Sequence, residues 1–218
     1  MSPRPYRMGQ RQAIVEETRA RVLAAARAVL TDPSGYKAFT VDAVAQAADV
    51  ARPTVYYQFG SKRGLIEALC DNLAAEGRMD DLAAAFSEPD PMVGLERLVA
   101  VFAQFWACDR AVTRRLRALA ALDPDIGHVI GARDERRRQA LGVLIGRMDA
   151  GSMQPAIRDT SATVAVLAAL TSFETFETIA GADGSADGSA DGGDADGRVA
   201  DEVARVVVRL LPTVLAMT

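Results

Sequence analysis

Polar, aromatic and basic side chains gather between residues 40 and 62 of this 218-residue sequence. A guanidinium group can pair bidentately with O6 and N7 of guanine, which discriminates between bases by about 1–3 kcal/mol. Lysine ammonium and hydroxyl groups reach phosphate oxygens. This set of groups therefore suits recognition of double-stranded DNA. The candidate residues are Thr40, Arg52, Pro53, Thr54, Tyr56, Tyr57, Gln58 and Lys62.

Two short helical patterns position these side chains. Thr40 precedes the first pattern, where its hydroxyl group can accept a backbone N–H as an N-cap. Asp49 tolerates the left-handed conformation of a tight turn, and Pro53 suits the first turn of a second helix. The segment therefore predicts a helix-turn-helix whose second helix can enter a major groove. The inward residues, spaced by three and four, are Val41, Val44, Ala45, Ala48, Val55 and Phe59.

Lys62 adds a separate indication of function. Gly60 is predicted to end the second helix, and Ser61 to cap the next one. Lys62 would then lie in a first turn, where the helix dipole favours anions over cations. A lysine is unfavourable there for stability but suited to gripping a phosphate together with the exposed N–H groups. The alternative is an all-helical small-molecule or protein-binding module in which the helix-turn-helix is vestigial.

These residues resemble the N-terminal DNA-binding domain of the TetR family of transcriptional regulators. The likeness covers about a quarter of the chain. It runs through TRARVLAAARAVL at 18–30, FTVDAVAQAADV at 39–50, PTVYYQFGSK at 53–62 and RGLIEAL at 63–69. The resemblance implies that Tyr56 and Lys62 contact phosphates and that Thr40 supplies a hydroxyl at the start of the motif. It places three residues at variable positions that face bases: Arg52, Pro53 and Tyr57.

The sequence departs from the family pattern at two positions. Asp49 stands where glycine is usual, which the turn tolerates, and Ala51 stands where serine is frequent, which removes a possible cap. The expected fold is all-α. It comprises a three-helix helix-turn-helix DNA-binding domain over 1–61 and a helical ligand-binding and dimerisation domain over 62–218.

Charge is divided unevenly along the chain. Residues 1–65 hold ten basic and five acidic side chains, which leaves +5, whereas the whole chain carries −4. A basic N-terminal third can bind DNA within an acidic protein. Residues 1–12 carry three arginines, two prolines and a glycine. They are predicted to form a flexible basic arm, which either contacts the DNA or is a solvated tail.

The remaining pattern predicts helices only. Within the helix at 110–122, Leu116, Leu119 and Leu122 are expected to face inward. Residues 181–197, rich in Gly, Asp, Ala and Ser, are predicted to be a flexible loop, and their acids do not match a calcium-binding pattern in any register. Helices are predicted over 12–31, about 110–122, 124–148, 158–180 and 198–216, and two more begin at Lys62 and Pro91.

Both of the last two helices, about 158–180 and 198–216, are apolar over more than one stripe. Such a helix needs two partners, and a second subunit can be one of them. A homodimer would set two reading helices about 34 Å apart on a palindromic operator. The resemblance implies the same dimer, and the alternative is a monomer with fully internal helices.

The resemblance also implies a pocket for a small-molecule effector. The candidate residues are Phe102, Phe105, Trp106, His128, Phe173 and Phe176. Aromatic side chains at helical spacing are also what a plain core would contain. No acid pair, nucleophile with a base, or metal-ligand spacing stands out, so neither an enzyme nor a cofactor or metal site is predicted.

The only cysteines, Cys70 and Cys108, are expected to be buried thiols, as in a reducing cytoplasm. The sequence shows neither a signal peptide nor an apolar run of about eighteen residues, so no membrane span is expected. The prediction is a cytoplasmic, dimeric transcriptional repressor that an effector releases from its operator.

Overall fold

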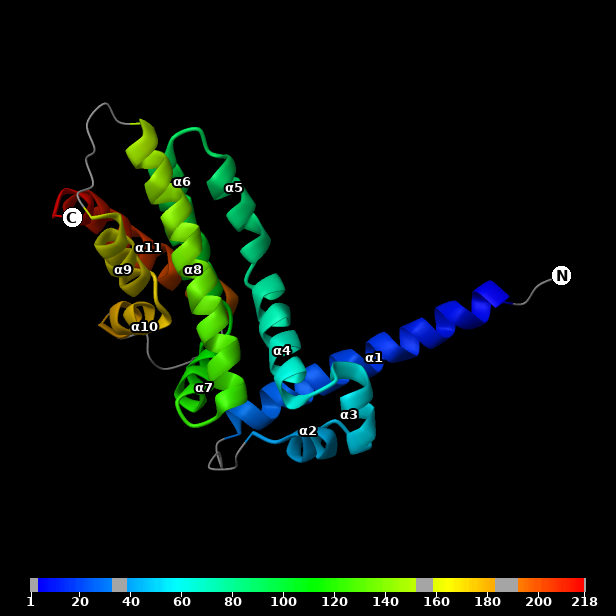
Figure 1. Ribbon diagram of the computed structural model, residues 1–218. Helices are drawn as coiled ribbons and strands as arrows, with labels where there is room; N and C mark the ends of the chain where they lie inside the picture. Colours follow the sequence, from blue (N-terminus) through cyan, green and yellow to red (C-terminus); the bar gives the residue numbers. More distant parts are fainter. Residues whose placement is uncertain (1–3, 33–38, 152–158, 183–191, 218) are drawn as a thin grey trace. The chain divides into compact units, whose positions relative to one another are not determined.

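The computed structural model describes residues 4–32, 39–151, 159–182 and 192–217 (Figure 1). Within these ranges the backbone forms helices and turns without a strand, which confirms the predicted all-α class. The helices are α1 (Arg4–Thr31), α2 (Val41–Ala47), α3 (Arg52–Phe59), α4 (Lys62–Glu76), the 3-10 helix Met79–Asp81, α5 (Leu82–Ser87), α6 (Pro91–Cys108), α7 (Arg110–Ala120), α8 (Pro124–Gly151), α9 (Thr160–Leu170), α10 (Phe173–Ala182) and α11 (Gly192–Met217).

Contacts divide the chain into two compact units. The first comprises Met1–Asn72 with Arg115–Val129, and the second comprises Leu73–Arg114 with Ile130–Thr218. Along the chain, α4, α7 and α8 each pass from one unit into the other. The first unit therefore holds the helix-turn-helix together with the turn between α7 and α8.

Of the residues predicted to face inward in the helix-turn-helix, five are buried, whereas Phe59 is only half-buried; the buried five are Val41, Val44, Ala45, Ala48 and Val55. Fully burying a Val, Leu or Ile side chain contributes about 1.5–3 kcal/mol to folding, so these few residues account for much of the unit's stability. The apolar residues of this unit that are at most 3% exposed are Val22, Ala26, Leu30, Phe39, Val44, Ala48, Val55, Leu65, Ile66, Leu69, Leu116, Ile126 and Val129.

In this unit α1 begins at Arg4, so the irregular backbone predicted before residue 12 is wrong over residues 4–11. Pro5 falls in the first turn, where a missing N–H costs nothing. Gly9 costs about 1 kcal/mol relative to alanine, too little to end a long helix. The rest of the predicted arm, residues 1–3, lies outside the described residues.

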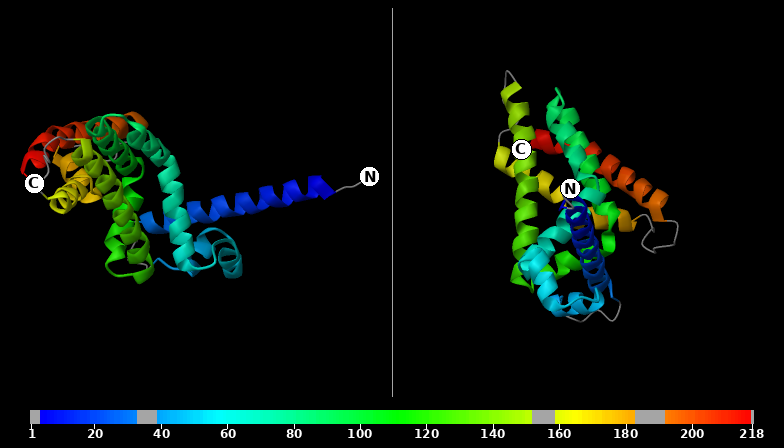
Figure 2. Two further views of the ribbon diagram at one scale, coloured as in Figure 1. Left: turned by 45° about the horizontal axis from the view of Figure 1, so that its top comes forward. Right: turned by 90° about the vertical axis from the view of Figure 1, so that its right-hand side faces the viewer.

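The second unit has its own core, formed by α5, α6, α8, α9, α10 and α11. α11 packs along α6, as both views in Figure 2 show. Leu95 and Leu98 of α6, Leu144 of α8 and Leu167 of α9 are fully buried in this cluster. The aromatic side chains of Phe102, Trp106, Phe173 and Phe176 belong to it as well.

The single helix predicted over 158–180 is wrong, because the chain breaks between α9 and α10. Thr171 is the C-cap of α9, and its carbonyl oxygen accepts hydrogen bonds from the side chains of Trp106 and Arg137. Ser172 then accepts the backbone N–H of Thr175 through its side-chain oxygen and starts α10. The break is thus stabilised by side chains far away in sequence, which a helical period cannot reveal.

Further differences concern segment ends. The loop predicted over 181–197 is wrong at both ends, because Gly181 and Ala182 close α10 and residues 192–197 open α11; its middle, 183–191, lies outside the described residues. α11 continues through Pro212. Leu122, predicted to face inward, is 81% exposed because it lies in the turn after α7. Cys70 is buried as expected, whereas Cys108, the last residue of α6, is exposed.

No helix of the described ranges has, by itself, both the length and the apolar composition for crossing a membrane. α9 and α10 reach that threshold only as a pair, and the pair is bent by 48°. Both helices contribute core residues, among them Leu167 and Phe176, which accounts for their apolar composition.

Candidate nucleic-acid interface

The helix-turn-helix has the local geometry that the sequence predicts. The Thr40 hydroxyl accepts the backbone N–H of Ala43 at 3.1 Å and caps α2. Asp49 adopts φ of 51°, and the N–H of Val50 donates to the carbonyl of Ala45 at 3.0 Å. The turn is therefore closed by the backbone, and Asp49 fills the position that glycine would favour.

α3 begins without a side-chain cap. Ala51 is its N-cap residue and makes no side-chain hydrogen bond there, as expected for alanine. Val55 is 1% exposed and anchors the helix, while Tyr57 is 85% exposed. Arg52, Pro53 and Tyr56 are exposed as well. The helix thus has one buried anchor and a broad polar and aromatic outer face.

Arg52 is already ordered by two neighbours. Its Nε pairs with the Asp42 carboxylate at 3.2 Å, and a terminal nitrogen donates to the Tyr56 hydroxyl at 3.2 Å. The guanidinium carbon lies 5.4 Å from the Tyr56 ring centroid. The Tyr56 hydrogen bond and then the Asp42 charge raise the pKa of Arg52 above its usual value. The sequence did not single out Asp42, which holds Arg52 along the outer face of the motif.

Gln58 and Thr54 are only partly available. Both are half-buried. The Gln58 amide nitrogen donates to the Val15 carbonyl of α1 at 3.3 Å, and Arg19 of α1 donates to the Gln58 carbonyl at 3.4 Å. The Arg19 guanidinium also lies 4.7 Å from the Phe59 ring centroid. These contacts fasten the last turn of α3 to α1, so Gln58 has a structural role that its sequence position did not indicate.

The junction of α3 and α4 places Lys62. Gly60 ends α3 with φ of 75°, a conformation that favours glycine, and the Ser61 side chain accepts the N–H of Gly64 at 3.0 Å. Lys62 is the first residue of α4, as predicted, but its ammonium group contacts the carboxylate of Asp123. Asp123 lies in the turn between α7 and α8, and the sequence analysis did not single it out as a partner of Lys62.

The carboxylate of Asp123 has further partners besides Lys62. It also accepts the backbone N–H groups of Asp125 at 3.1 Å and Ile126 at 3.4 Å, which caps α8. Burial acts to raise the pKa of Asp123. The hydrogen bond and charge of Lys62 and the two backbone N–H groups outweigh that effect, so the pKa is lowered. Asp123 is therefore an ionised group that joins two helix starts.

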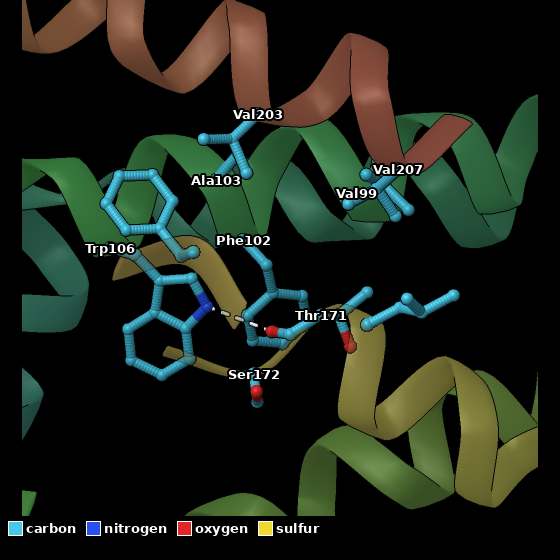
Figure 3. Close-up of a pocket in the computed structure, with 10 residues that line it drawn as sticks. Val99, Phe102, Ala103, Trp106, Thr171, Ser172, Val203 and Val207 are labelled. Carbon is cyan, nitrogen blue, oxygen red and sulfur yellow. Dashed lines mark hydrogen bonds between the residues drawn. The ribbon is translucent and has the colours of Figure 1, made fainter. Parts of the chain in front are cut away.

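The second unit holds a small cavity between α6, the α9–α10 junction, α10 and α11 (Figure 3). Its volume of about 10 Å³ is roughly that of one water molecule. Phe102, Trp106 and Phe176 line it, and the Trp106 indole N–H donates to the Thr171 carbonyl at 3.0 Å. Three of the predicted effector residues thus meet around one cavity.

The other three predicted effector residues do not line this cavity. The Phe105 and Phe173 ring centroids are 4.6 and 5.6 Å from that of Trp106, so both rings belong to the same aromatic cluster without lining the cavity. His128 belongs to the first unit and is exposed, and its Nδ1 lies 2.7 Å from the Pro124 carbonyl. The cluster therefore forms without His128.

Arginines surround the aromatic cluster. Arg137 of α8 is 5% exposed, and a terminal guanidinium nitrogen lies 3.3 Å from a carboxylate oxygen of Asp134. The guanidinium carbon of Arg137 lies 5.8 Å from the ring centroids of both Phe102 and Trp106. Arg110 and Arg114 of α7 both pair with Glu177 of α10. The sequence analysis did not predict the burial of Arg137, because a charged residue within an otherwise polar stretch of α8 gives no sign of burial.

Of the residues that the structure describes, no three or more His, Cys, Asp or Glu side chains are grouped so as to hold a metal ion.

Comparison with protein families agrees with the geometry of the N-terminal segment. Residues 22–69 match the model of the bacterial regulatory proteins of the tetR family. This range contains α2, α3, the first half of α4 and the part of α1 from Val22 to Thr31. A comparison with curated proteins gives no match.

Solved structures match over nearly the full length. A TetR transcription regulator from Haloarcula marismortui has a TM-score of 0.63 and 16% identity, covering 91% of this chain and 98% of that one. GusR of Salmonella enterica has a TM-score of 0.61 and 19% identity, covering 91% and 95%. A transcriptional regulator from Saccharomonospora viridis, in complex with choline, has a TM-score of 0.58 and 16% identity, covering 90% and 96%. At these identities the matches show a shared fold.

Proposed function

We propose that this chain, whose residues 22–69 match the tetR family of bacterial regulatory proteins, is a DNA-binding transcription regulator that binds a palindromic operator as a homodimer and is released by a small-molecule effector. One observation carries the proposal: the polar and aromatic outer face of α3 stays exposed while Val55 alone anchors that helix. A structural helix pair has no need of such a face. The output proposed for operator binding is repression, and the proposed compartment is the cytoplasm.

The exposed residues of α3 divide into two proposed roles. Arg52, Pro53 and Tyr57 face bases, where Arg52 can release Asp42 and pair with a guanine, and Tyr57 can pack on a thymine methyl group. Tyr56 and Lys62 contact phosphates, which fixes register without reading sequence. Three further residues at the edge of this surface, each partly engaged in the fold, complete the proposed site: Thr40, Thr54 and Gln58.

The proposed dimer forms through α9, α10 and α11, which correspond to the two apolar segments of the sequence. Val166 of α9 is 39% exposed and Leu210 of α11 is 42% exposed, so each helix retains an uncovered apolar side chain. Val166→Asp and Leu210→Asp should convert the dimer to monomer in sedimentation velocity. Val143→Asp is the control, since Val143 is 53% exposed on α8 and lies outside the proposed interface.

The proposed effector site is the aromatic cluster of Phe102, Phe105, Trp106, Phe173 and Phe176. Its cavity of about 10 Å³ is too small for an organic molecule, so effector binding must separate α10 from α6 or α11. Coupling of this opening to operator release requires the effector to bind the two states unequally.

The chemistry of the walls favours a small apolar or aromatic effector. The Saccharomonospora viridis regulator was solved with choline, a cation. In this chain the rings of Phe102, Trp106 and Phe176 already have the guanidinium groups of Arg137 or Arg110 at 5.8 Å from their centroids. A ligand cation would meet like charge there, so we expect a different ligand for this chain.

Operator binding in the presence of candidate effectors tests the release step. The purified protein is bound to an operator selected from random duplexes and titrated with small aromatic and aliphatic molecules. A compound that lowers operator affinity, and fails to do so with Phe176→Leu, supports the proposal. Binding of such a compound in calorimetry without any change in operator affinity would instead support a binding module with a vestigial helix-turn-helix.

A further inference from the structure

The pairing of Lys62 with Asp123 is unusual for a residue proposed to bind phosphate. Both side chains are mostly buried, with 25% and 21% of their surfaces exposed. A partly desolvated pair interacts more strongly than a fully exposed one, because water screens it less. In the protein without DNA, Lys62 is therefore already neutralised by an anion of its own chain.

The anion is fixed in place. The backbone N–H groups of Asp125 and Ile126 donate to the Asp123 carboxylate. The backbone N–H of Gly127 donates to the backbone carbonyl of Asp123 at 2.8 Å. A Cβ on Gly127 would lie 2.7 Å from the Ala120 carbonyl oxygen, so the turn between α7 and α8 is closely packed. Asp123 cannot swing aside by a side-chain rotation without losing the cap of α8.

Lys62 in turn needs an anion. As the first residue of α4 it lies at the positive end of the helix dipole, where a cation is unfavourable unless an anion lies beside it. Asp123 and a DNA phosphate can both serve as that anion. A phosphate approaching Lys62 meets the negative charge of Asp123 at the same group, and like charges at such a distance repel.

We propose that Asp123 competes with an operator phosphate for the Lys62 ammonium group, and thereby sets the affinity of the protein for DNA. This inference rests on the proposed role of Lys62 as a phosphate contact. Asp123 acts through Lys62 and is a positioning residue, which holds the ammonium group back until DNA replaces the carboxylate. The effect of Asp123 on affinity is expected to be the same for every base sequence, because phosphate groups carry no sequence information.

The same competition offers a route for the effector. The turn that carries Asp123 joins α7 and α8, and both helices continue into the second unit. There α7 carries Arg110 and Arg114, which pair with Glu177, and α8 carries Arg137 beside the aromatic cluster. A displacement of either helix by an effector reaches Asp123 through the chain itself and strengthens or weakens its hold on Lys62.

The test compares Asp123→Asn with Asp125→Asn. Asparagine keeps an oxygen that can cap α8 but loses the charge that holds Lys62. Asp125 lies two residues further on, in the first turn of α8, and is not the partner of Lys62, so its substitution controls for the loss of one negative charge. Affinity for the selected operator and for an unrelated duplex is measured over a range of salt concentrations. Both substitutions are also made in Lys62→Ala protein.

We expect Asp123→Asn to bind both duplexes about tenfold more tightly, the effect of one charged hydrogen bond gained. The slope of log affinity against log salt should steepen by up to about 0.9, since one more phosphate is neutralised without an internal exchange. Asp125→Asn should change neither quantity as much. In Lys62→Ala protein, Asp123→Asn should have no effect beyond that of the control. Asp123→Ser, which also keeps a capping oxygen, replaces Asp123→Asn if thermal unfolding shows that variant to be misfolded.

Two results would overturn the inference alone. One is an Asp123→Asn protein that binds no more tightly than Asp125→Asn. The other is an equal gain with and without Lys62. If the wild-type protein binds no duplex at low salt, the proposed function fails and the inference fails with it. A wild-type protein that binds its operator, and loses affinity on Lys62→Ala, therefore separates the two failures.

Discussion

The two candidate sites differ in how far their aromatic side chains are exposed. In the first, Tyr57 is 85% exposed on α3 and Tyr56 is 38% exposed beside it. In the second, Phe102, Trp106 and Phe176 are at most 7% exposed around a cavity of one water molecule. The first unit thus keeps these two aromatic side chains accessible to a partner, whereas the proposed effector cluster of the second unit must open to admit one. The difference indicates that the proposed DNA-binding face is exposed before any partner binds, whereas the proposed effector site is not.

Aromatic truncation should separate the two units most strongly. Phe176→Ala removes a ring that is 1% exposed and should lower the free energy of unfolding by about 3–5 kcal/mol. Tyr57→Ala should change that free energy by less than about 0.5 kcal/mol, because the side chain is exposed, yet weaken operator binding. Chemical denaturation and anisotropy titrations measure both. Equal losses of stability in the two variants would contradict the division into a closed and an open site.

Within the DNA site, phosphate and base contacts should respond differently. Lys62→Ala should weaken binding to all duplexes alike and reduce the salt slope by about 0.9. Arg52→Ala should relax the preference at one base pair by about 1–3 kcal/mol. Titrations against the operator and its single-pair variants distinguish them. If both substitutions affect every duplex equally, the proposed division of roles is wrong.

The cap of α2 should matter less. Thr40→Ala removes the oxygen that accepts the Ala43 N–H and should cost about 1 kcal/mol of stability. Thr40→Ser retains that oxygen and should cost only a few tenths. Thermal unfolding at matched concentration gives the comparison. A serine variant as unstable as the alanine variant would show that the methyl group, rather than the hydroxyl, stabilises the motif.

The smallest expected effect concerns the pH dependence of folding stability. The pKa of Asp123 is lowered in the folded state, so its contribution to stability is present above the unfolded pKa and lost as pH falls through the lower folded value. Wild-type stability should therefore decline below about pH 4 more steeply than that of Asp123→Asn. Urea unfolding from pH 6 to pH 3 provides the test. Parallel curves for the two proteins would contradict the charged pairing with Lys62.

The local geometry of the proposed DNA site was largely predictable, because short-range sequence rules determine it. The Thr40 cap, the left-handed Asp49, the glycine at 60 and the Ser61 cap each depend on residues within four positions. A period of three to four residues located its buried anchors. Contacts with residues distant in sequence were not predictable. Gln58 donates to Val15, 43 residues away, and Lys62 pairs with Asp123, 61 residues away.

The second unit was predictable as helices but not as a site. The break at Thr171 depends on Trp106 and Arg137, 65 and 34 residues away, and neither residue leaves a local signal there. Burial of Arg137 is likewise decided by the packing of α6 and α9. His128, chosen because it is the only histidine, lies in the other unit and takes no part in the aromatic cluster.

Selection of bound duplexes from a random DNA library tests the central claim most directly. A dimer that reads DNA through two copies of α3 should enrich a palindrome whose half-sites lie about 10 base pairs apart, one turn of the duplex or a multiple of it. That result would establish the operator and give the duplex for every experiment above. If the folded protein enriches no sequence at low salt, α3 does not read bases, and the chain is a helical binding module with a vestigial helix-turn-helix.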